Sequence, residues 1–131
     1  MNANVKKIGT DFEREFCKIL AENGFWVHFI TPDRTGSQPF DVIAAKNGCA
    51  YAFDCKTCEA PTFGVNRLED NQIMAFDKWL KCGNGNAYIA IKHKDKIYIA
   101  PYLKIITMKS VRISEMIMFD DWSHNNDTQN V

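Results

Sequence analysis

The chain has 131 residues and a mass of 15.0 kDa, which is the size of one domain. Hydrophobic residues make up 46% of it, enough to bury a core, and this excludes an intrinsically disordered protein. No apolar run approaches the roughly 20 residues of a membrane span, and the first residues form no apolar signal segment. The five cysteines are odd in number and irregularly spaced, which is typical of reduced thiols. Composition therefore predicts a cytoplasmic protein with no membrane contact.

The formal net charge is zero, but the charges are unevenly distributed. Residues 92–112 contain six basic residues and one acidic residue, a local charge of +5, whereas residues 115–131 contain four acidic residues and no basic one. A net charge of zero argues against a protein that binds nucleic acid non-specifically over its whole surface, and it is compatible with a local basic face. Residues 124–131 are polar and predict a disordered tail, which leaves residues 1–123 as a single domain.

The first predicted element is a helix over residues 5–22. Its apolar face has the spacing i, i+4, i+7 and i+8 and consists of Phe12, Phe16, Ile19 and Leu20. Asn23-Gly24 ends the helix, because glycine accepts the positive φ of a helix C-terminus. A strand is predicted over residues 25–30, and a loop with two prolines and a glycine follows over residues 31–39.

A hairpin comes next in the chain. Strands predicted over residues 40–45 and 50–56 flank Asn47-Gly48, a pair that is typical of tight hairpin turns. A second helix is then expected to begin after an N-cap at Asn66, with Glu69 three residues on.

This second helix is expected to end near residue 82, before Gly83. A second hairpin is predicted over residues 87–92 and 96–100, and residues 102–122 receive no assignment. The order αβββαββ describes an α/β fold, in which one central sheet is flanked by helices.

The charged residues of the first hairpin are the strongest indication of chemistry. Asp54 and Lys56 are two residues apart on one strand, so their side chains share a face about 6–7 Å apart along it. Asp41 begins the partner strand, close enough for its carboxylate to approach Asp54. Two adjacent carboxylates repel each other unless a cation lies between them, and oxygen ligands favour Mg²⁺ or Mn²⁺. The same spacing also fits a plain surface ion pair between Asp54 and Lys56.

The second helix carries a glutamine, Gln72, on its apolar face. At about 100° per residue, its neighbours on that face are Leu68, Ile73, Phe76, Trp79 and Leu80. A buried amide needs a defined partner, so Gln72 is expected to hold a water molecule or a substrate phosphate near the carboxylates. The alternative is a rim residue whose amide reaches solvent.

The first helix offers two further acids, Glu13 and Glu15. They lie on opposite shoulders of the apolar stripe, and helical geometry does not choose between them. Either fits as a third carboxylate of the site, and ordinary solvation on a helix surface explains at least one of them.

In this order and spacing, the motifs resemble those of the PD-(D/E)XK nuclease superfamily. The similarity covers residues 6–103 and is strongest to Holliday junction resolvases, both the archaeal type and the RecU type of Gram-positive bacteria. The segments that carry it are residues 8–15, 23–27, 36–37, 39–41 and 54–56, then the glutamine helix and residues 86–91.

The resemblance implies a restriction-endonuclease-like core with a mixed β-sheet, and a metal-dependent DNA endonuclease acting on four-way junctions. Position by position, it assigns as metal ligands Asp41, Asp54 and the backbone carbonyl of Cys55. Glu13 matches the helix glutamate of the family because it lies four residues after Gly9, and Glu15 does not match.

Two further positions complete the implied centre, since Lys56 matches the catalytic lysine and Gln72 the helix glutamine. The chain departs from the family where Asp54 replaces the more frequent Glu. It also lacks the projecting stalk of RecU-type enzymes, because four residues join its two central strands, so junction selectivity through such a stalk is not expected.

The resemblance also implies a homodimer of bacterial or phage origin, because two cuts related by a two-fold axis require two active sites. DNA contacts are expected near the active centre at Lys6, Lys7, Arg34, Ser37 and Gln38. The alternatives are a restriction or repair nuclease and a non-catalytic DNA-binding protein of the same fold. A different class is a thiol-redox protein that uses Cys55 and Cys58, although Cys55 lies in a strand rather than at a helix start.

Overall fold

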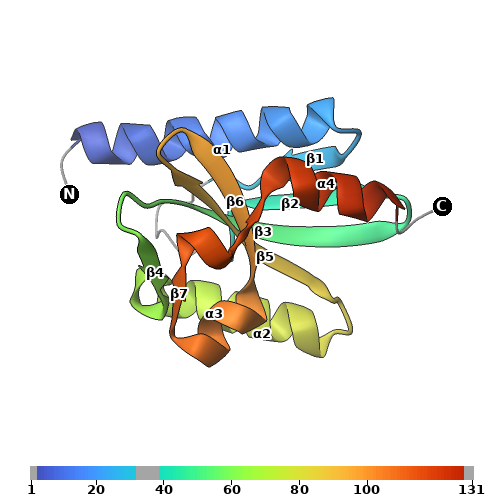
Figure 1. Ribbon diagram of the computed structural model, residues 1–131. Helices are drawn as coiled ribbons and strands as arrows, with labels where there is room; N and C mark the ends of the chain where they lie inside the picture. The colour runs from blue at the N-terminus through green and yellow to red at the C-terminus, as the bar shows by residue number, and fades with distance from the viewer. Residues whose placement is uncertain (1–2, 32–38, 129–131) are drawn as a thin grey trace.

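The central sheet has six strands, in the order β1 (Trp26–Phe29), β2 (Val42–Lys46), β3 (Cys49–Thr57), β5 (Asn86–His93), β6 (Lys96–Pro101) and β8 (Ile117–Met118) (Figure 1). This computed structural model describes residues 3–31 and 39–128, with side chains for residues 11–31 and 39–125. β3 and β5 are parallel, and the other neighbouring strands are antiparallel. The predicted mixed sheet is therefore observed.

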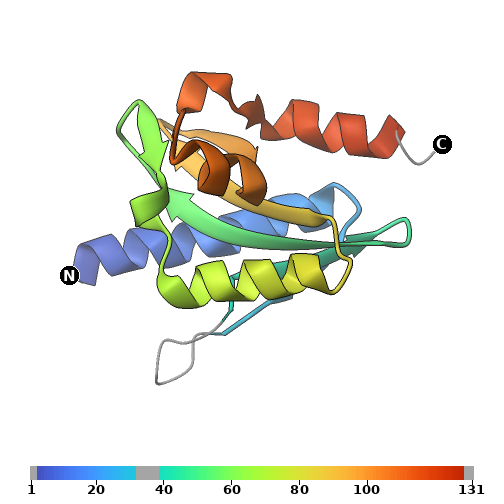
Figure 2. The ribbon, with the colours of Figure 1, turned by 90° about the horizontal axis from the view of Figure 1, so that it is seen from below.

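Helices cover both faces of this sheet. α1 (Ala3–Glu22) and α4 (Phe119–Thr128) lie on one face, whereas α2 (Asp70–Lys81) and α3 (Tyr102–Met108) lie on the other (Figure 1, Figure 2). Each face has its own cluster of buried apolar side chains. The sheet is thus buried between two helical layers, and its strands carry long apolar runs for that reason.

The alternation of side chains along β3 decides what reaches each layer. Phe53 packs against Phe16 of α1 with ring centroids 5.0 Å apart, whereas Ala52 belongs to the cluster beneath α2. The turn between β2 and β3 has positive φ at Asn47 (53°) and at Gly48 (79°), as the Asn-Gly pair predicts. The predicted hairpin and its two faces are confirmed.

The predicted N-cap at Asn66 is wrong. Asn66 lies inside a short 3₁₀ helix, η1 (Val65–Arg67), and Glu69 is the N-cap of α2. The Glu69 side chain accepts a hydrogen bond from the backbone of Gln72, and the Gln72 side chain accepts one from the Glu69 backbone, which is a capping box. The backbone N–H of Val65 donates to the carbonyl of Lys109 (2.8 Å), so a distant segment holds η1 in place and delays the start of the helix.

Further differences from the predicted order lie in two segments for which neither a helix nor a strand is predicted. The segment 57–65 contains β4 (Thr62–Gly64), which pairs with β7 (Ser110–Arg112) in a second, two-stranded sheet. Residues 102–122 contain α3, β7, the 3₁₀ helix η2 (Ile113–Glu115), β8 and the start of α4. α4 continues to Thr128, so the chain is helical across the predicted domain boundary at residue 124. No helix in the described part of the chain is long and apolar enough to cross a membrane.

Candidate active site

Two buried aspartates meet where β2 begins and β3 ends. Asp54 is fully buried, and Asp41 retains 5% of its exposure. The Asp41 backbone N–H donates to the carbonyl of Phe53 (3.1 Å), and its Oδ2 accepts a hydrogen bond from the Cys55 backbone N–H (2.8 Å). The predicted proximity of Asp41 to the Asp54-Cys55-Lys56 segment is therefore confirmed. A surface ion pair is excluded as the explanation of Asp54, because this residue has no exposure to solvent.

Burial and mutual repulsion alter the protonation of this pair. Burial raises the pKa of Asp54 well above its usual range, the Asp41 charge raises it further, and the Lys56 charge opposes both. At Glu13, burial and then the charge of Asp41 raise the pKa to about 7, again opposed by Lys56. Glu13 therefore belongs to the same electrostatic cluster as the two aspartates.

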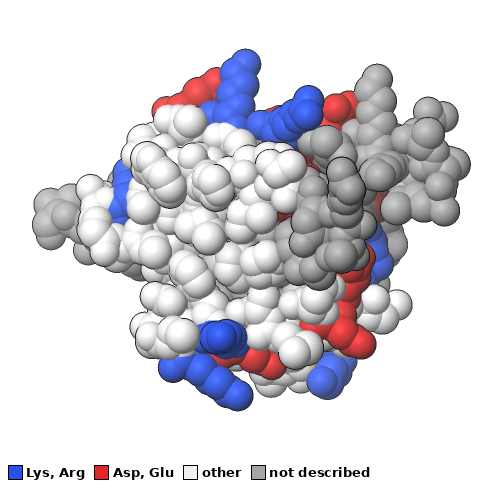
Figure 3. Space-filling view, turned by 180° about the vertical axis from the view of Figure 1, so that it is seen from behind, with Lys and Arg blue, Asp and Glu red and all other residues white. Residues whose placement is uncertain are grey.

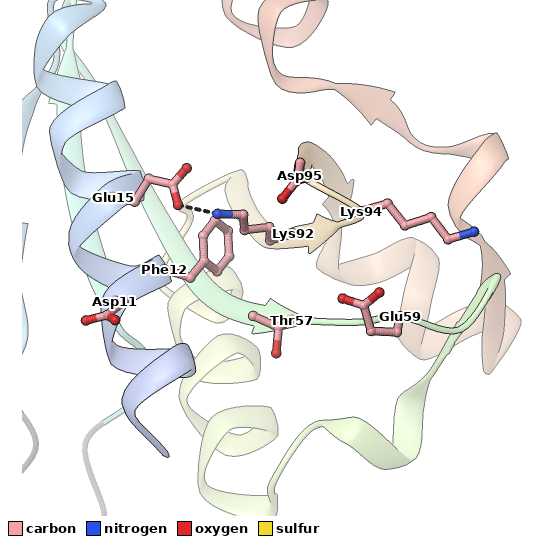
Figure 4. Close-up of a pocket in the computed structure, with 8 residues that line it drawn as sticks. All are labelled: Asp11, Phe12, Glu15, Thr57, Glu59, Lys92, Lys94 and Asp95. Carbon is pink, nitrogen blue, oxygen red and sulfur yellow. Dashed lines mark hydrogen bonds and ion pairs between the residues drawn. The ribbon is translucent and has the colours of Figure 1, made fainter. Parts of the chain in front are cut away.

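The structure separates the two glutamates of α1 that the sequence left equivalent. Glu13 is half-buried, and the charges of Asp41 and Lys56 both act on its pKa. Glu15 instead forms an ion pair with Lys92 of β5, with 2.6 Å between Oε1 and Nζ (Figure 4). Of the two, Glu13 is therefore the one available to the carboxylate cluster.

Gln72 connects the start of α2 to the charged residues of β3. Its Nε2 donates to Oδ1 of Asp54 (2.8 Å), and its Oε1 accepts from Nζ of Lys56 (3.2 Å) and from the backbone N–H of Glu69 (3.0 Å). Two donors around Oε1 fix the orientation of the amide, so Nε2 must face Asp54. Gln72 is 8% exposed, which confirms that it faces the sheet and is not a rim residue.

One oxygen of Asp54 remains without a hydrogen-bond donor. Oδ2 is buried and accepts no hydrogen bond, although Nζ of Lys56 lies 3.3 Å from it. A buried carboxylate oxygen in this state is costly unless a cation or a proton reaches it. The donor set of Asp41, Asp54 and the adjacent backbone is made of hard oxygens, which fits a divalent cation such as Mg²⁺.

Side chains alone do not form a complete ligand set. Within residues 11–31 and 39–125, no three His, Cys, Asp or Glu side chains lie close enough together to hold a metal ion. A ligand set here has to include a backbone oxygen, and the resemblance names the carbonyl of Cys55 for this purpose. Oδ2 of Asp54, which accepts no hydrogen bond and pairs only with Lys56 among the described side chains, and the cluster of acidic charge both favour a cation at this position.

The cysteines of the C-x-x-C sequence are poor candidates for redox chemistry. Cys55 and Cys58 are buried free thiols. Burial raises the pKa of Cys55 well above its usual range, and the charges of Asp41 and Asp54 raise it further. The Sγ of Cys58 donates weak hydrogen bonds to the carbonyls of Ala60 and Thr62, both at 3.5 Å. Cys55 therefore lacks the lowered pKa of a redox-active thiol.

A separate cavity of about 720 Å³ lies between α1 and the β5–β6 hairpin (Figure 4). Its walls include the Glu15–Lys92 ion pair and Thr57 but neither Asp41 nor Asp54. The candidate catalytic residues thus lie beside this cavity rather than in it.

Five expected DNA contacts fall where the structure gives no side-chain positions. Arg34, Ser37 and Gln38 lie outside the described residues, and Lys6 and Lys7 lie in the part of α1 whose side chains are not described. Sequence reasoning did not identify Arg67, whose side chain contacts the end of β3. It also missed the role of Glu69, which the spacing of Glu69 and Gln72 indicates as a capping box.

These features define the class of protein. The mixed sheet carries two buried aspartates and a lysine, and a helix glutamine forms hydrogen bonds with one of the aspartates and with the lysine. This arrangement is the core of a PD-(D/E)XK nuclease. Residues 4–123 match the model of the family described as archaeal Holliday junction resolvase (Hjc), and the chain belongs to that family.

Individual relatives agree with this assignment. The chain is 31% identical over 110 residues to the crossover junction endodeoxyribonuclease Hjc of Methanocaldococcus jannaschii, a match that covers 83% of this chain and 77% of that protein. The fold is similar to the structure of Hjc, a Holliday junction resolvase from Archaeoglobus fulgidus, with a TM-score of 0.66 and 18% identity over 88% of this chain and 98% of that one. Both relatives are archaeal, so the comparisons do not support the predicted bacterial or phage origin.

Proposed function

We propose that this protein resolves four-way DNA junctions by Mg²⁺-dependent hydrolysis of phosphodiester bonds. As a member of the Hjc family it is a crossover junction endodeoxyribonuclease, and membership also implies a divalent metal ion. The observation that carries the proposal for this chain is the buried pair Asp41 and Asp54, held beside Lys56 by Gln72.

The metal ligands in this proposal are Asp41, Asp54 and the carbonyl oxygen of Cys55, while Glu13, which does not form a three-carboxylate ligand set with the two aspartates, adds its charge to the cluster. A divalent ion bound to such oxygens supplies a Lewis acid that lowers the pKa of water and offsets charge on a phosphate. Gln72 keeps one oxygen of Asp54 engaged through the 2.8 Å hydrogen bond, whereas the other oxygen, Oδ2, accepts no hydrogen bond and pairs with Lys56 at 3.3 Å, so a metal ion would share Oδ2 with that ammonium group. The backbone N–H of Cys55 orients Asp41 in the same way.

Lys56 is the cation that this centre holds permanently. Its Nζ lies 3.3 Å from Oδ2 of Asp54 and 3.2 Å from Oε1 of Gln72, and its side chain is 16% exposed. A positive charge fixed in this position is suited to orient a water molecule and to stabilise charge that develops on a phosphoryl oxygen. Gln72 and Asp54 therefore hold the Lys56 ammonium group in position, and the positive charge of Lys56 in turn stabilises the buried Asp54 carboxylate.

The same proposal includes a homodimer and a cytoplasmic location. A junction has two-fold symmetry, so paired cuts require two copies of the site. The middle of the face seen in Figure 3 is a broad area of described residues without Lys, Arg, Asp or Glu, with charged side chains around its edge, and an uncharged surface does not repel its own copy. Sedimentation of the free protein tests this part of the proposal, and a monomer at micromolar concentration would contradict it.

The enzymatic proposal is tested with three labelled substrates: a synthetic four-way junction, a linear duplex of the same sequence and a single strand. We expect paired cuts in the junction with Mg²⁺, none with EDTA, and at least tenfold slower cutting of the duplex. Equal cutting of junction and duplex would indicate a restriction or repair nuclease. Binding without cutting in Mg²⁺ and in Mn²⁺ would indicate a non-catalytic protein of this fold.

The raised pKa of Glu13 predicts how stability depends on pH in the absence of metal. The pKa rises from 4.5 to about 7 on folding, so between these values the folded protein binds a proton that the unfolded chain has lost. The free energy of unfolding should therefore fall as the pH rises through this window, with a share of about 1 kcal/mol from Glu13 after allowance for solvent screening. Urea unfolding in EDTA at pH 5 and pH 7.5 measures the difference.

In the Glu13→Gln variant the loss of stability between these pH values should be smaller. The matched control is Glu15→Gln, which removes an acid from the same helix on the Lys92 side and should leave the pH dependence nearly unchanged. Mg²⁺ should restore stability at pH 7.5 more than at pH 5, because the ion competes with the proton. An identical pH dependence in all three proteins would place Glu13 outside the cluster.

A second prediction concerns the thiols. The Cys55→Ala, Cys58→Ala double variant should keep Mg²⁺-dependent cleavage within about threefold, because every residue type has the backbone carbonyl proposed as the ligand at position 55. Both side chains are buried, so a loss of roughly 1–3 kcal/mol of stability is expected. A folded double variant that binds the junction and cannot cut it would contradict this prediction and would indicate that at least one of the two thiols takes part in cleavage.

A further inference from the structure

Arg67 is the last residue of η1, and its side chain is hydrogen-bonded to the last residue of β3. Its Nη2 donates a hydrogen bond of 2.8 Å to the carbonyl of Thr57, which directly follows Lys56 in the chain. The guanidinium carbon also lies 5.5 Å from the centroid of the Phe63 ring, in a cation–π contact. Two contacts of different kinds therefore fix the position of the guanidinium group.

The charge of Arg67 has no counterion among the described side chains. The residue is exposed, and no described carboxylate lies within ion-pairing distance of it. The bond to Thr57 uses one of five N–H donors, which leaves the rest of the planar fork free for a ligand. A preorganised, unpaired guanidinium is suited to a phosphate, which it can bind through two parallel hydrogen bonds.

The position of Arg67 relates it to the reaction centre. Thr57, its hydrogen-bond partner, is the neighbour of Lys56, and Lys56 in turn bonds to Gln72 in the first turn of α2. η1 and the start of α2 thus form one border of the centre. The guanidinium is close to that border without touching Asp41, Asp54 or Gln72 through any described hydrogen bond.

We propose that Arg67 binds a backbone phosphate of the DNA next to the bond that is cut. This inference rests on the proposed function and adds a specific substrate contact to it. The ligand is the phosphodiester group, which is the same in every sequence, so Arg67 contributes affinity and register and does not read bases. It takes no part in the chemical step.

Binding of a synthetic four-way junction in EDTA, where hydrolysis is absent, tests the inference at several salt concentrations. Arg67→Ala should raise the Kd about fivefold at moderate salt. It should also reduce the slope of log K against log salt by about 0.9, the value for one phosphate contact. Single-turnover cleavage in Mg²⁺ at saturating protein should change less than threefold.

Lys81→Ala is the matched control, because it removes one exposed positive charge from the opposite end of α2. We expect its Kd and salt slope to stay at wild-type values. Arg67→Lys keeps the charge without the fork, so it should recover the salt slope and part of the affinity. This variant separates phosphate binding from a loss of local structure.

An unchanged Kd and salt slope in Arg67→Ala would overturn the inference, as would a weaker Kd with an unchanged slope, since that result indicates a structural role. Failure of the wild-type protein to bind the junction would instead contradict the proposed function. The two failures are therefore distinguishable.

Discussion

Asp54→Asn is expected to abolish junction cleavage, with a fall of at least about a thousandfold in the single-turnover rate, or roughly 4 kcal/mol of transition-state stabilisation. The change replaces one charged oxygen, at the position where Oδ2 accepts no hydrogen bond, by an amide N–H₂ that cannot bind a cation. The remaining oxygen still accepts the hydrogen bond from Gln72, so the local structure should persist.

The same variant should be more resistant to thermal unfolding than the wild type in EDTA at pH 8. Asp54 is fully buried next to Asp41, and burial first and then the neighbouring charge raise its pKa, so the wild type loses stability as the pH rises above the usual pKa of an aspartate, and Asn does not. The gain should disappear toward pH 4, close to that usual pKa, where this loss begins. Junction binding in EDTA should stay within a few-fold of the wild type.

Asp95→Asn provides the control, because it makes the same chemical change in the exposed turn between β5 and β6. Its cleavage rate and its melting temperature should both match the wild type. If Asp54→Asn cut junctions at the wild-type rate in Mg²⁺, the metal site proposed at Asp41 and Asp54 would be wrong.

Gln72→Leu is expected to lower the cleavage rate at least tenfold, about 1.4 kcal/mol. The amide is the group that orients Asp54 through Nε2 and holds Lys56 through Oε1, and leucine can do neither. A rim residue replaced by leucine would leave the protein equally or more stable. Here the buried oxygen Oδ1 of Asp54 loses its donor, so the variant should also lose about 1–2 kcal/mol of stability.

Part of that loss belongs to the start of the helix, because Oε1 of Gln72 also accepts the backbone N–H of Glu69. Glu69→Ala is the control for this contribution: it removes the N-cap carboxylate and should cost about 1 kcal/mol, yet it keeps the Gln72 side chain and should slow cleavage less than threefold. Urea unfolding and single-turnover cleavage of both variants form the deciding comparison. Equal rate losses in the two variants would assign Gln72 to helix stability alone.

Local patterns in the sequence determined the helices and hairpins that frame the site. The periods of 3.6 and 2 residues, the Asn47-Gly48 turn and the apolar stripe of α1 depend on neighbours in the chain, and all of them are observed. The face that Asp54 and Lys56 share follows from strand geometry in the same way. Gln72 was predictable as a buried polar residue because helical spacing places it among apolar neighbours.

Contacts between segments that are distant in the sequence decided which glutamate joins the site and where α2 begins. Glu13 and Glu15 are equivalent on a helical wheel and become different because Lys92, 77 residues after Glu15, takes Glu15 into an ion pair. The start of α2 moved from Asn66 to Glu69 because Lys109 holds η1 from another part of the fold.

Residues 102–122 alternate short helices and strands that have no period of their own, since β7 and β8 exist through pairing with β4 and β6. The direction of the Gln72 amide and the position of Arg67 likewise required the end of β3 to be in place. Helix and strand propensities of a few tenths of a kcal/mol per residue decide whether a segment forms a helix or a strand. The partner of a charged or polar side chain is decided by the tertiary structure, because burial removes the water that the side chain would otherwise bind.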